Sequence, residues 1–92
     1  MTNGDLLTMV KANLAITSAA WNTYLEQLVQ VARKEIAREG ITIDDEAIDD
    51  CNLIVMYASY LYRKRVEDNA AMPRMLRYAL NNRVMAEKGA TT

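Results

Sequence analysis

Apolar side chains recur every three or four residues along most of the chain, which is the spacing of one face of an α-helix. The pattern predicts four helices and no strand. The first helix is predicted to begin at an N-cap, Asp5, and to end near Ala15. The second is predicted to follow a cap at Thr17 or Ser18 and to end at Gly40, since glycine commonly terminates helices.

The third predicted helix follows a short β-branched connector, residues 41–43, and is capped by Thr42 or Asp44. Its first turns are acidic and its last turn, residues 63–65, is basic, which complements the helix dipole. Between these ends, nearly all side chains of residues 53–62 are apolar or aromatic around the whole helix. Such a helix must be covered on every side, either by other helices of the same chain or, on one face, by a neighbouring subunit.

The fourth predicted helix begins at Pro73, after a polar loop at residues 67–71, and ends at Gly89, which leaves residues 90–92 as a frayed tail. One face of this helix consists of Leu76, Ala79, Leu80 and Arg83. Another face consists of Met75, Tyr78, Asn82 and Met85. We expect Leu76, Ala79 and Leu80 to pack against a face of the third helix made of Ile54, Ala58 and Leu61. We expect three arginines to point outward: Arg74, Arg77 and Arg83.

The length of 92 residues predicts one domain, residues 1–92, because so short a chain cannot bury two separate cores. We therefore expect an all-α protein, a small bundle of about four helices with a long central helix pair. Phenylalanine is absent, whereas six methionines and five tyrosines supply much of the apolar bulk. Methionine-rich apolar surface adapts readily to a partner.

The chain has no histidine and a single cysteine, Cys51, which leaves no means of building a zinc cluster, a disulfide or a Ser/His or Cys/His pair. We expect Cys51 to be a small buried hydrophobic side chain. The three glycines form no phosphate-binding loop, and the carboxylates of residues 44–50 are typical of a solvated helix start. We therefore predict no enzyme activity, no catalytic residue, no cofactor and no metal ion.

Neither a signal peptide nor a run of about 18 apolar residues occurs, so we expect a soluble intracellular protein that does not bind membranes. Charge is unevenly distributed along the chain. Residues 1–62 carry four basic and nine acidic side chains, a net charge of −5, whereas residues 63–92 carry seven basic and three acidic ones, a net charge of +4. Such a chain can pair head to tail with its own copies, or present its basic end to a polyanion.

The basic end offers three interpretations: solvated surface arginines, contacts with another subunit, or contacts with the phosphates of a nucleic acid without sequence reading. Its cationic side chains are Arg63, Lys64, Arg65, Arg74, Arg77 and Arg83. A helix-turn-helix around Gly40 is not expected, because the second helix would begin DDEAIDD and bring carboxylates to the phosphates.

Two segments together resemble a known family. YASYLYRKR, residues 57–65, and MPRMLRYALNNRVMAEKG, residues 72–89, are similar to the carboxy-terminal half of the head-tail connector proteins of tailed bacteriophages and related prophages. Residues 5–43 are similar to the family's short first helix and longer second helix, which ends at a glycine before an extended connector. The resemblance is specific in MPRMLRYALNNR and generic elsewhere.

The resemblance implies a non-enzymatic adaptor of the virion neck, assembled in the bacterial host cytoplasm. Its subunits would form a homo-oligomeric ring of about twelve copies by heterologous contacts. The ring would dock beneath the portal protein, extend the DNA channel toward the tail-side head-completion protein, and contact DNA in the channel without specificity. We assign the candidate subunit or portal interface to Tyr57, Tyr60, Arg63, Lys64, Arg65, Arg74, Arg77, Asn81, Asn82 and Arg83.

An alternative function fits the same composition. A small dimeric helical protein could hold DNA or another regulator through its basic carboxy-terminal helix. Salt dependence distinguishes the two functions, because binding driven by phosphate contacts weakens steeply with salt.

Overall fold

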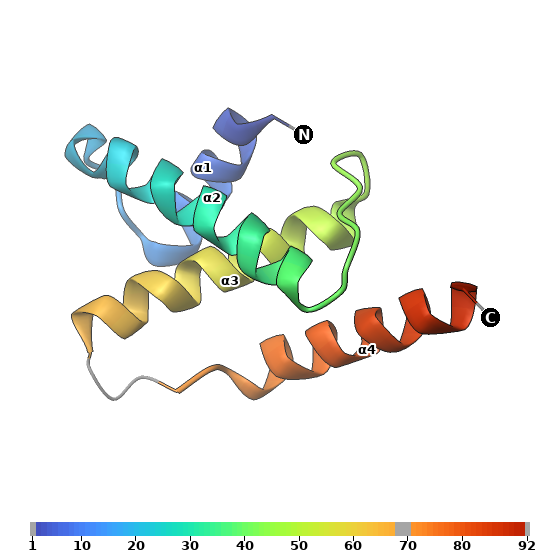
Figure 1. Ribbon diagram of the computed structural model, residues 1–92. Helices are drawn as coiled ribbons and strands as arrows, with labels where there is room; N and C mark the ends of the chain where they lie inside the picture. The colour runs from blue at the N-terminus through green and yellow to red at the C-terminus, as the bar shows by residue number, and fades with distance from the viewer. Residues whose placement is uncertain (1, 68–70, 92) are drawn as a thin grey trace.

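The computed structural model describes residues 2–67 and 71–91, and their side chains up to residue 88. These residues form four α-helices, one short 3-10 helix and no strand, which confirms the all-α prediction for the described part of the chain (Figure 1). The elements in chain order are α1 (Asn3–Leu14), η1 (Ala19–Trp21), α2 (Asn22–Arg38), α3 (Ile48–Val66) and α4 (Arg74–Thr91).

Helix α1 begins two residues earlier than the sequence pattern predicts. Thr2 is the N-cap, and its hydroxyl accepts a hydrogen bond of 3.1 Å from the backbone N–H of Asp5. The Asp5 carboxylate in turn accepts one of 3.0 Å from the Thr2 N–H. This reciprocal pair is a capping box, in which Asp5 is the third helical residue and not the cap. At the other end, Ala15 adopts the left-handed conformation, with φ of 57°.

The start of α2 is a composite, and its end follows the prediction. Ser18 caps the 3-10 turn η1, in which its hydroxyl accepts from the Ala20 N–H, and α2 continues from there. After Arg38 the chain turns at Gly40, whose φ of 95° is strained for other residues. The predicted stop at Gly40 is therefore confirmed, whereas the predicted cap at Thr17 or Ser18 is correct only for Ser18 and η1, since the N-cap of α2 itself is Trp21.

Helix α3 starts at Ile48, several residues later than predicted. Its N-cap is Ala47, which provides no side-chain hydrogen bond, so neither Thr42 nor Asp44 is the cap. The acidic side chains satisfy backbone groups of the loop instead. The Asp44 carboxylate accepts from the Glu46 N–H at 2.9 Å, and the Asp50 carboxylate accepts from the Asp44 N–H at 2.7 Å. Aspartates compete well for such local bonds, which favour turns over helix.

The core lies where α1, α2 and α3 meet, and α4 adds two leucines to it. Its buried apolar side chains are Leu6, Leu7, Val10, Leu25, Leu28, Val29, Ala32, Ile36, Ile41, Cys51, Leu53, Ile54, Val55, Tyr57, Ala58, Leu76 and Leu80. The apolar stretch 53–62 of α3 is thus covered mostly by helices of the same chain. Only its half-buried side chains, Met56, Tyr60, Leu61 and Tyr62, remain open to a neighbouring molecule.

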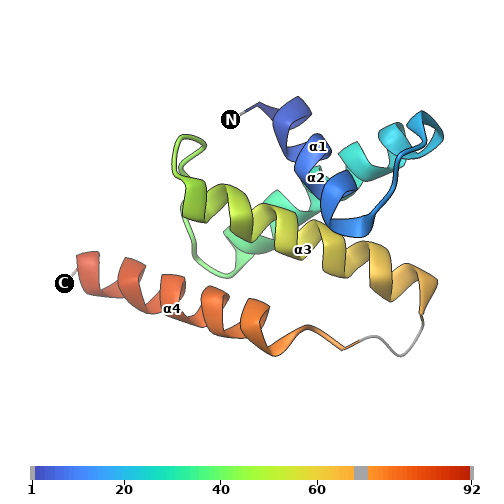
Figure 2. The ribbon, with the colours of Figure 1, turned by 180° about the vertical axis from the view of Figure 1, so that it is seen from behind.

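Helix α4 lies along α3 on the side away from α1 and runs antiparallel to α3, as both views show (Figures 1 and 2). On α4 itself, the side chains of Leu76 and Leu80 are fully buried, and those of Ala79 and Arg83 are half-buried. The predicted inner face of this helix is therefore confirmed. The helix continues through Gly89 to Thr91, so the predicted stop at Gly89 is wrong. Thr92 and residues 68–70 of the predicted polar loop lie outside the described residues.

Candidate interaction surface

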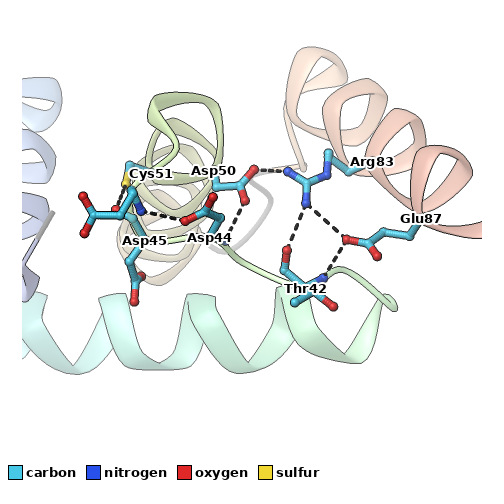
Figure 3. A network of polar contacts seen from close by, with 8 residues as sticks. Thr42, Asp44, Asp45, Asp50, Cys51, Arg83 and Glu87 are labelled. Carbon is cyan, nitrogen blue, oxygen red and sulfur yellow. Dashed lines mark hydrogen bonds and ion pairs between the residues drawn. The ribbon is translucent and has the colours of Figure 1, made fainter. Parts of the chain in front are cut away.

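A polar network fastens the carboxy-terminal half of α4 to the rest of the bundle (Figure 3). Arg83 donates to the carboxylate of Asp50, to the backbone carbonyl of Thr42 at 2.9 Å and to Glu87 at 3.2 Å. The carboxylate of Glu87 also accepts from the Thr42 N–H at 3.1 Å. Arg83 therefore does not point outward, contrary to the sequence-based expectation. It joins α4 to the start of α3 and to the connector after α2.

The burial of Asp50 explains why the network needs an arginine. The residue is only 2% exposed, and a buried carboxylate is costly unless it is paired and hydrogen-bonded. Its two oxygens are satisfied by Arg83 and by the Asp44 N–H. At the edge of the network, the hydrogen bond from the Thr42 N–H, aided by Arg83, lowers the pKa of Glu87 below its ordinary value. Both carboxylates thus have positions fixed by the fold.

Two further arginines of α4 differ in their surroundings. Arg77 forms an ion pair of 2.9 Å with Glu39 near the end of α2, and both side chains are partly exposed. Arg74 is exposed and has no ion pair within the part of the chain that the structure describes. Of the three arginines expected to point outward, Arg74 alone is thus both exposed and without a partner among the described residues.

The basic end of α3 carries three exposed cations beside aromatic rings. The guanidinium carbon of Arg65 lies 4.7 Å from the centroid of the Tyr24 ring, and the ammonium of Lys64 lies 5.9 Å from that of Tyr60. Arg63 is exposed on the same turn. Trp21 contacts the edges of Tyr24 and Tyr62, with centroid distances of 6.3 and 6.2 Å. Lys64 and Arg65 are exposed despite these cation–π contacts, so their charges remain accessible to an anionic partner.

One side of α4 faces away from the bundle, and we name it the outer face of α4: Arg74, Tyr78, Asn81 and Met85. Their spacing of four, three and four residues places them on one stripe, opposite the buried leucines. Tyr78 is 58% exposed and Met85 is 68% exposed. Met75, at 76%, and Asn82 are exposed beside this stripe. Large apolar side chains that lie together and uncovered on one side of a helix are typical of an interaction site.

A second feature lies between α3 and α4. A groove of about 280 Å³ is lined by Asp49, Asp50, Asn52, Leu53, Met56, Ala79 and Arg83. We name it the α3–α4 groove. Leu53 is buried and Met56 and Ala79 are half-buried, so much of its lining is apolar. Asp49 is exposed and has no ion pair among the described residues.

The structure separates the predicted interface residues. Tyr57 is 8% exposed and belongs to the core, where burial raises the pKa of its hydroxyl, so it is not available at a surface. Tyr60 is half-buried at the basic end of α3. Asn81 is on the outer face of α4, and Asn82 is next to it. The predicted residues thus fall into four places: the core, the basic end of α3, the exposed part of α4 and, for Arg83, the polar network.

Sequence reasoning missed part of the surface. The sequence pattern places Tyr78 and Met85 on one face of the fourth helix, but the predicted interface does not include them. Their position around the helix, on the side opposite Leu76 and Leu80, indicates that they are exposed. Asp49 and Met56 were missed because the groove forms only when α4 packs against α3, which no local pattern reveals.

Comparisons with protein-family models, with curated proteins and with solved structures gave no match. Among the side chains that the structure describes, no three His, Cys, Asp or Glu residues are grouped as metal ligands. None of the helices in the described part of the chain has the length and apolar character needed to cross a bilayer.

Proposed function

We propose that this protein is a structural head-tail connector subunit of a phage or prophage particle, and that it acts by docking on other polypeptides. The observation that carries the proposal is the outer face of α4. It presents two exposed apolar side chains, Tyr78 and Met85, together with a cation, Arg74, that has no ion pair among the described residues. The α3–α4 packing and the Asp50–Arg83 pair hold that face in place.

The distribution of charge supports assembly from identical subunits. The exposed Asp49 lies in the first turn of α3, and Arg63, Lys64 and Arg65 lie in its last turn. The rise of α3 places these two turns about 22 Å apart. The molecule is also elongated and flat, with extents of 46 × 31 × 17 Å. Opposite charges at the two ends of such a body favour contacts in which one end meets the other end of a copy.

The connector role adds partners to this geometry. In that role about twelve subunits form a ring. A heterologous contact relates each subunit to the next by a fixed rotation, and the ring closes when these rotations add up to a full turn. The ring binds the portal protein on one side and the tail-side head-completion protein on the other, and surrounds the DNA channel. The resemblance of YASYLYRKR and MPRMLRYALNNR to the connector family supports this specific assignment.

Binding to portal-bearing capsids tests the function. Purified protein is mixed with DNA-filled capsids that have a portal but no tail, and with capsids that lack the portal, and both are recovered by sedimentation. We expect stoichiometric binding only to the portal-bearing capsids, and native mass spectrometry of the protein with isolated portal should give one ring per portal. Equal recovery with both kinds of capsid, or none with either, would refute the connector role.

A second candidate, non-specific DNA binding, is favoured by the basic end of α3. Its three cations make no ion pair with an acidic side chain in the described part of the chain, and the nearby indole of Trp21 is 44% exposed. Binding to duplex DNA that falls steeply between low and physiological salt would support this function. Capsid binding through an apolar face should change far less over the same range.

A further inference from the structure

We propose that the outer face of α4 of one copy docks into the α3–α4 groove of the next copy, with Arg74 beside Asp49. The inference rests on the proposed connector function, since it names the two surfaces through which the subunits of the ring would meet. Each surface is described above on the isolated chain, and neither is filled by the described part of that chain.

The two surfaces complement each other chemically. The groove has an apolar lining from Leu53, Met56 and Ala79 and one exposed acidic residue, Asp49. The outer face of α4 offers two apolar side chains and an exposed cation, Arg74. Neither Asp49 nor Arg74 has an ion pair in the described part of the chain. A docked pair therefore joins two unpaired charges of opposite sign around an apolar centre.

The size of the groove fits a side chain of this helix. Pockets that hold small molecules of drug size generally have about 300–1,000 Å³. The groove has about 280 Å³, which suits one large side chain such as Tyr78. Tyrosine is favoured at the centre of interfaces because its ring buries a large area while its hydroxyl remains able to form a hydrogen bond.

Geometry makes the contact intermolecular and directional. Tyr78 lies opposite Leu76 and Leu80 on α4, whereas Ala79 and Arg83 line the groove on another side of the same helix. A rigid copy cannot place its own outer face into its own groove. Since the two surfaces differ, each docked copy leaves one of each kind open for the next, and the contact is heterologous.

The contact is small, and this determines how it must be measured. An aromatic side chain such as Tyr78 buries on the order of 150–250 Å², so a contact centred on this single ring falls below the roughly 800 Å² per partner of a stable complex. We therefore expect weak association in free solution, in the micromolar to millimolar range. On the portal, attachment of adjacent subunits to one particle raises their effective concentration and completes the ring.

Charge reversal at the two positions provides a decisive test. Arg74→Glu alone and Asp49→Lys alone each bring like charges together, and we expect each to weaken self-association at least about tenfold. In an equimolar mixture the two variants can alternate. Each contact then joins either Glu at position 74 to Lys at position 49 or the native Arg74 to the native Asp49, so assembly should return to near the wild-type level. Tyr78→Ala should weaken association, and mixing it with either charge variant should not restore association.

Association is followed by sedimentation velocity up to millimolar protein and by ring formation on portal-bearing capsids. Lys34→Glu and Glu26→Lys are the matched controls, since they make the same charge changes at exposed positions of α2, a helix that contributes no residue to either surface. Circular dichroism checks that every variant is folded. Single variants that assemble like the wild type, or weakened variants that the mixture does not rescue, would overturn the Arg74–Asp49 contact.

The outcome also separates this contact from the proposed function. If all charge variants bind portal-bearing capsids and form rings as the wild type does, the connector role stands and the pairing of surfaces is wrong. If the wild-type protein neither self-associates nor binds these capsids, both proposals fail. If the wild type assembles on portal-bearing capsids, each single charge variant is weakened and the mixture of the two recovers assembly, the connector role and the pairing of surfaces are both supported.

Discussion

Replacing Arg83 with methionine removes the guanidinium from Asp50 and keeps an unbranched side chain of high helix propensity. The carboxylate of Asp50, which is only 2% exposed in the wild type, then keeps one donor, the Asp44 N–H, and the Thr42 carbonyl also loses a donor. Breaking a buried ion pair on one side costs about 3–5 kcal/mol. Because Arg83 is itself 31% exposed, water can reach the vacated side, and we expect a loss of about 2–3 kcal/mol.

This loss is a large part of the total stability, since the free energy of unfolding of a chain of this length is roughly 5–14 kcal/mol. Urea titration followed by circular dichroism should show it directly. With a slope of about 1 kcal/mol per molar urea, the midpoint should fall by roughly 2–3 M. The exposed Arg77–Glu39 pair provides the matched control, and Arg77→Met should cost less than about 1 kcal/mol.

A double variant isolates the interaction itself. Asp50→Asn together with Arg83→Met leaves no buried charge, so its cost should be smaller than the sum of the two single costs. The reasoning is refuted if Arg83→Met and Arg77→Met destabilise the protein equally, or if the two changes in the double variant simply add. Either result would show that the network contributes no more than an ordinary surface pair.

Three further predictions concern the inner face of α4, the first helix and pH. Leu80→Ala should cost about 2–5 kcal/mol in urea titrations because the side chain is fully buried, whereas Met85→Ala, at a position 68% exposed, should cost little. Thr2→Ala removes the capping box of α1 and should lower the free energy of unfolding by about 1 kcal/mol in the same titrations. Thr2→Ser keeps the hydroxyl and should have little effect. The pKa of Glu87 is lowered from 4.5 in the fold, so its contribution to stability is present above that pH and is lost as the pH falls through the lower, folded-state pKa. Unfolding midpoints measured from neutral pH to about pH 3 should therefore decline less steeply for Glu87→Gln than for the wild type; equal slopes would contradict this contribution.

The helix content and the inner face of α4 were predictable because both depend on local periodicity. The positions of Leu76 and Leu80 follow from a repeat of three or four residues, whatever the remainder of the chain does. The start of α3 was not predictable in the same way. Asp44 suits an N-cap as well as it suits a turn, and the choice depends on Asp50, whose carboxylate accepts a bond from the loop.

The role of Arg83 shows where a usable signal was overlooked. Periodicity placed this arginine on the same face as Leu76 and Leu80, yet it was expected to point outward. A charged residue on an apolar face indicates a buried partner, since an unpaired charge there would be too costly. The identity of that partner, 33 residues earlier in the chain, depends on how α4 packs and could not be read from the sequence.

The opposite sides of α4 also have different freedom to evolve. Changes at Leu80 or Arg83 alter the fold of the subunit and so affect every activity it has, whereas changes at Tyr78 or Met85 leave the bundle intact. Partner preference can therefore drift, or be re-engineered, by substitutions on one helix without a compensating loss of folding. If α4 docks as proposed, related chains would share the inward leucines and differ in the outward residues, which would match the partner of each chain.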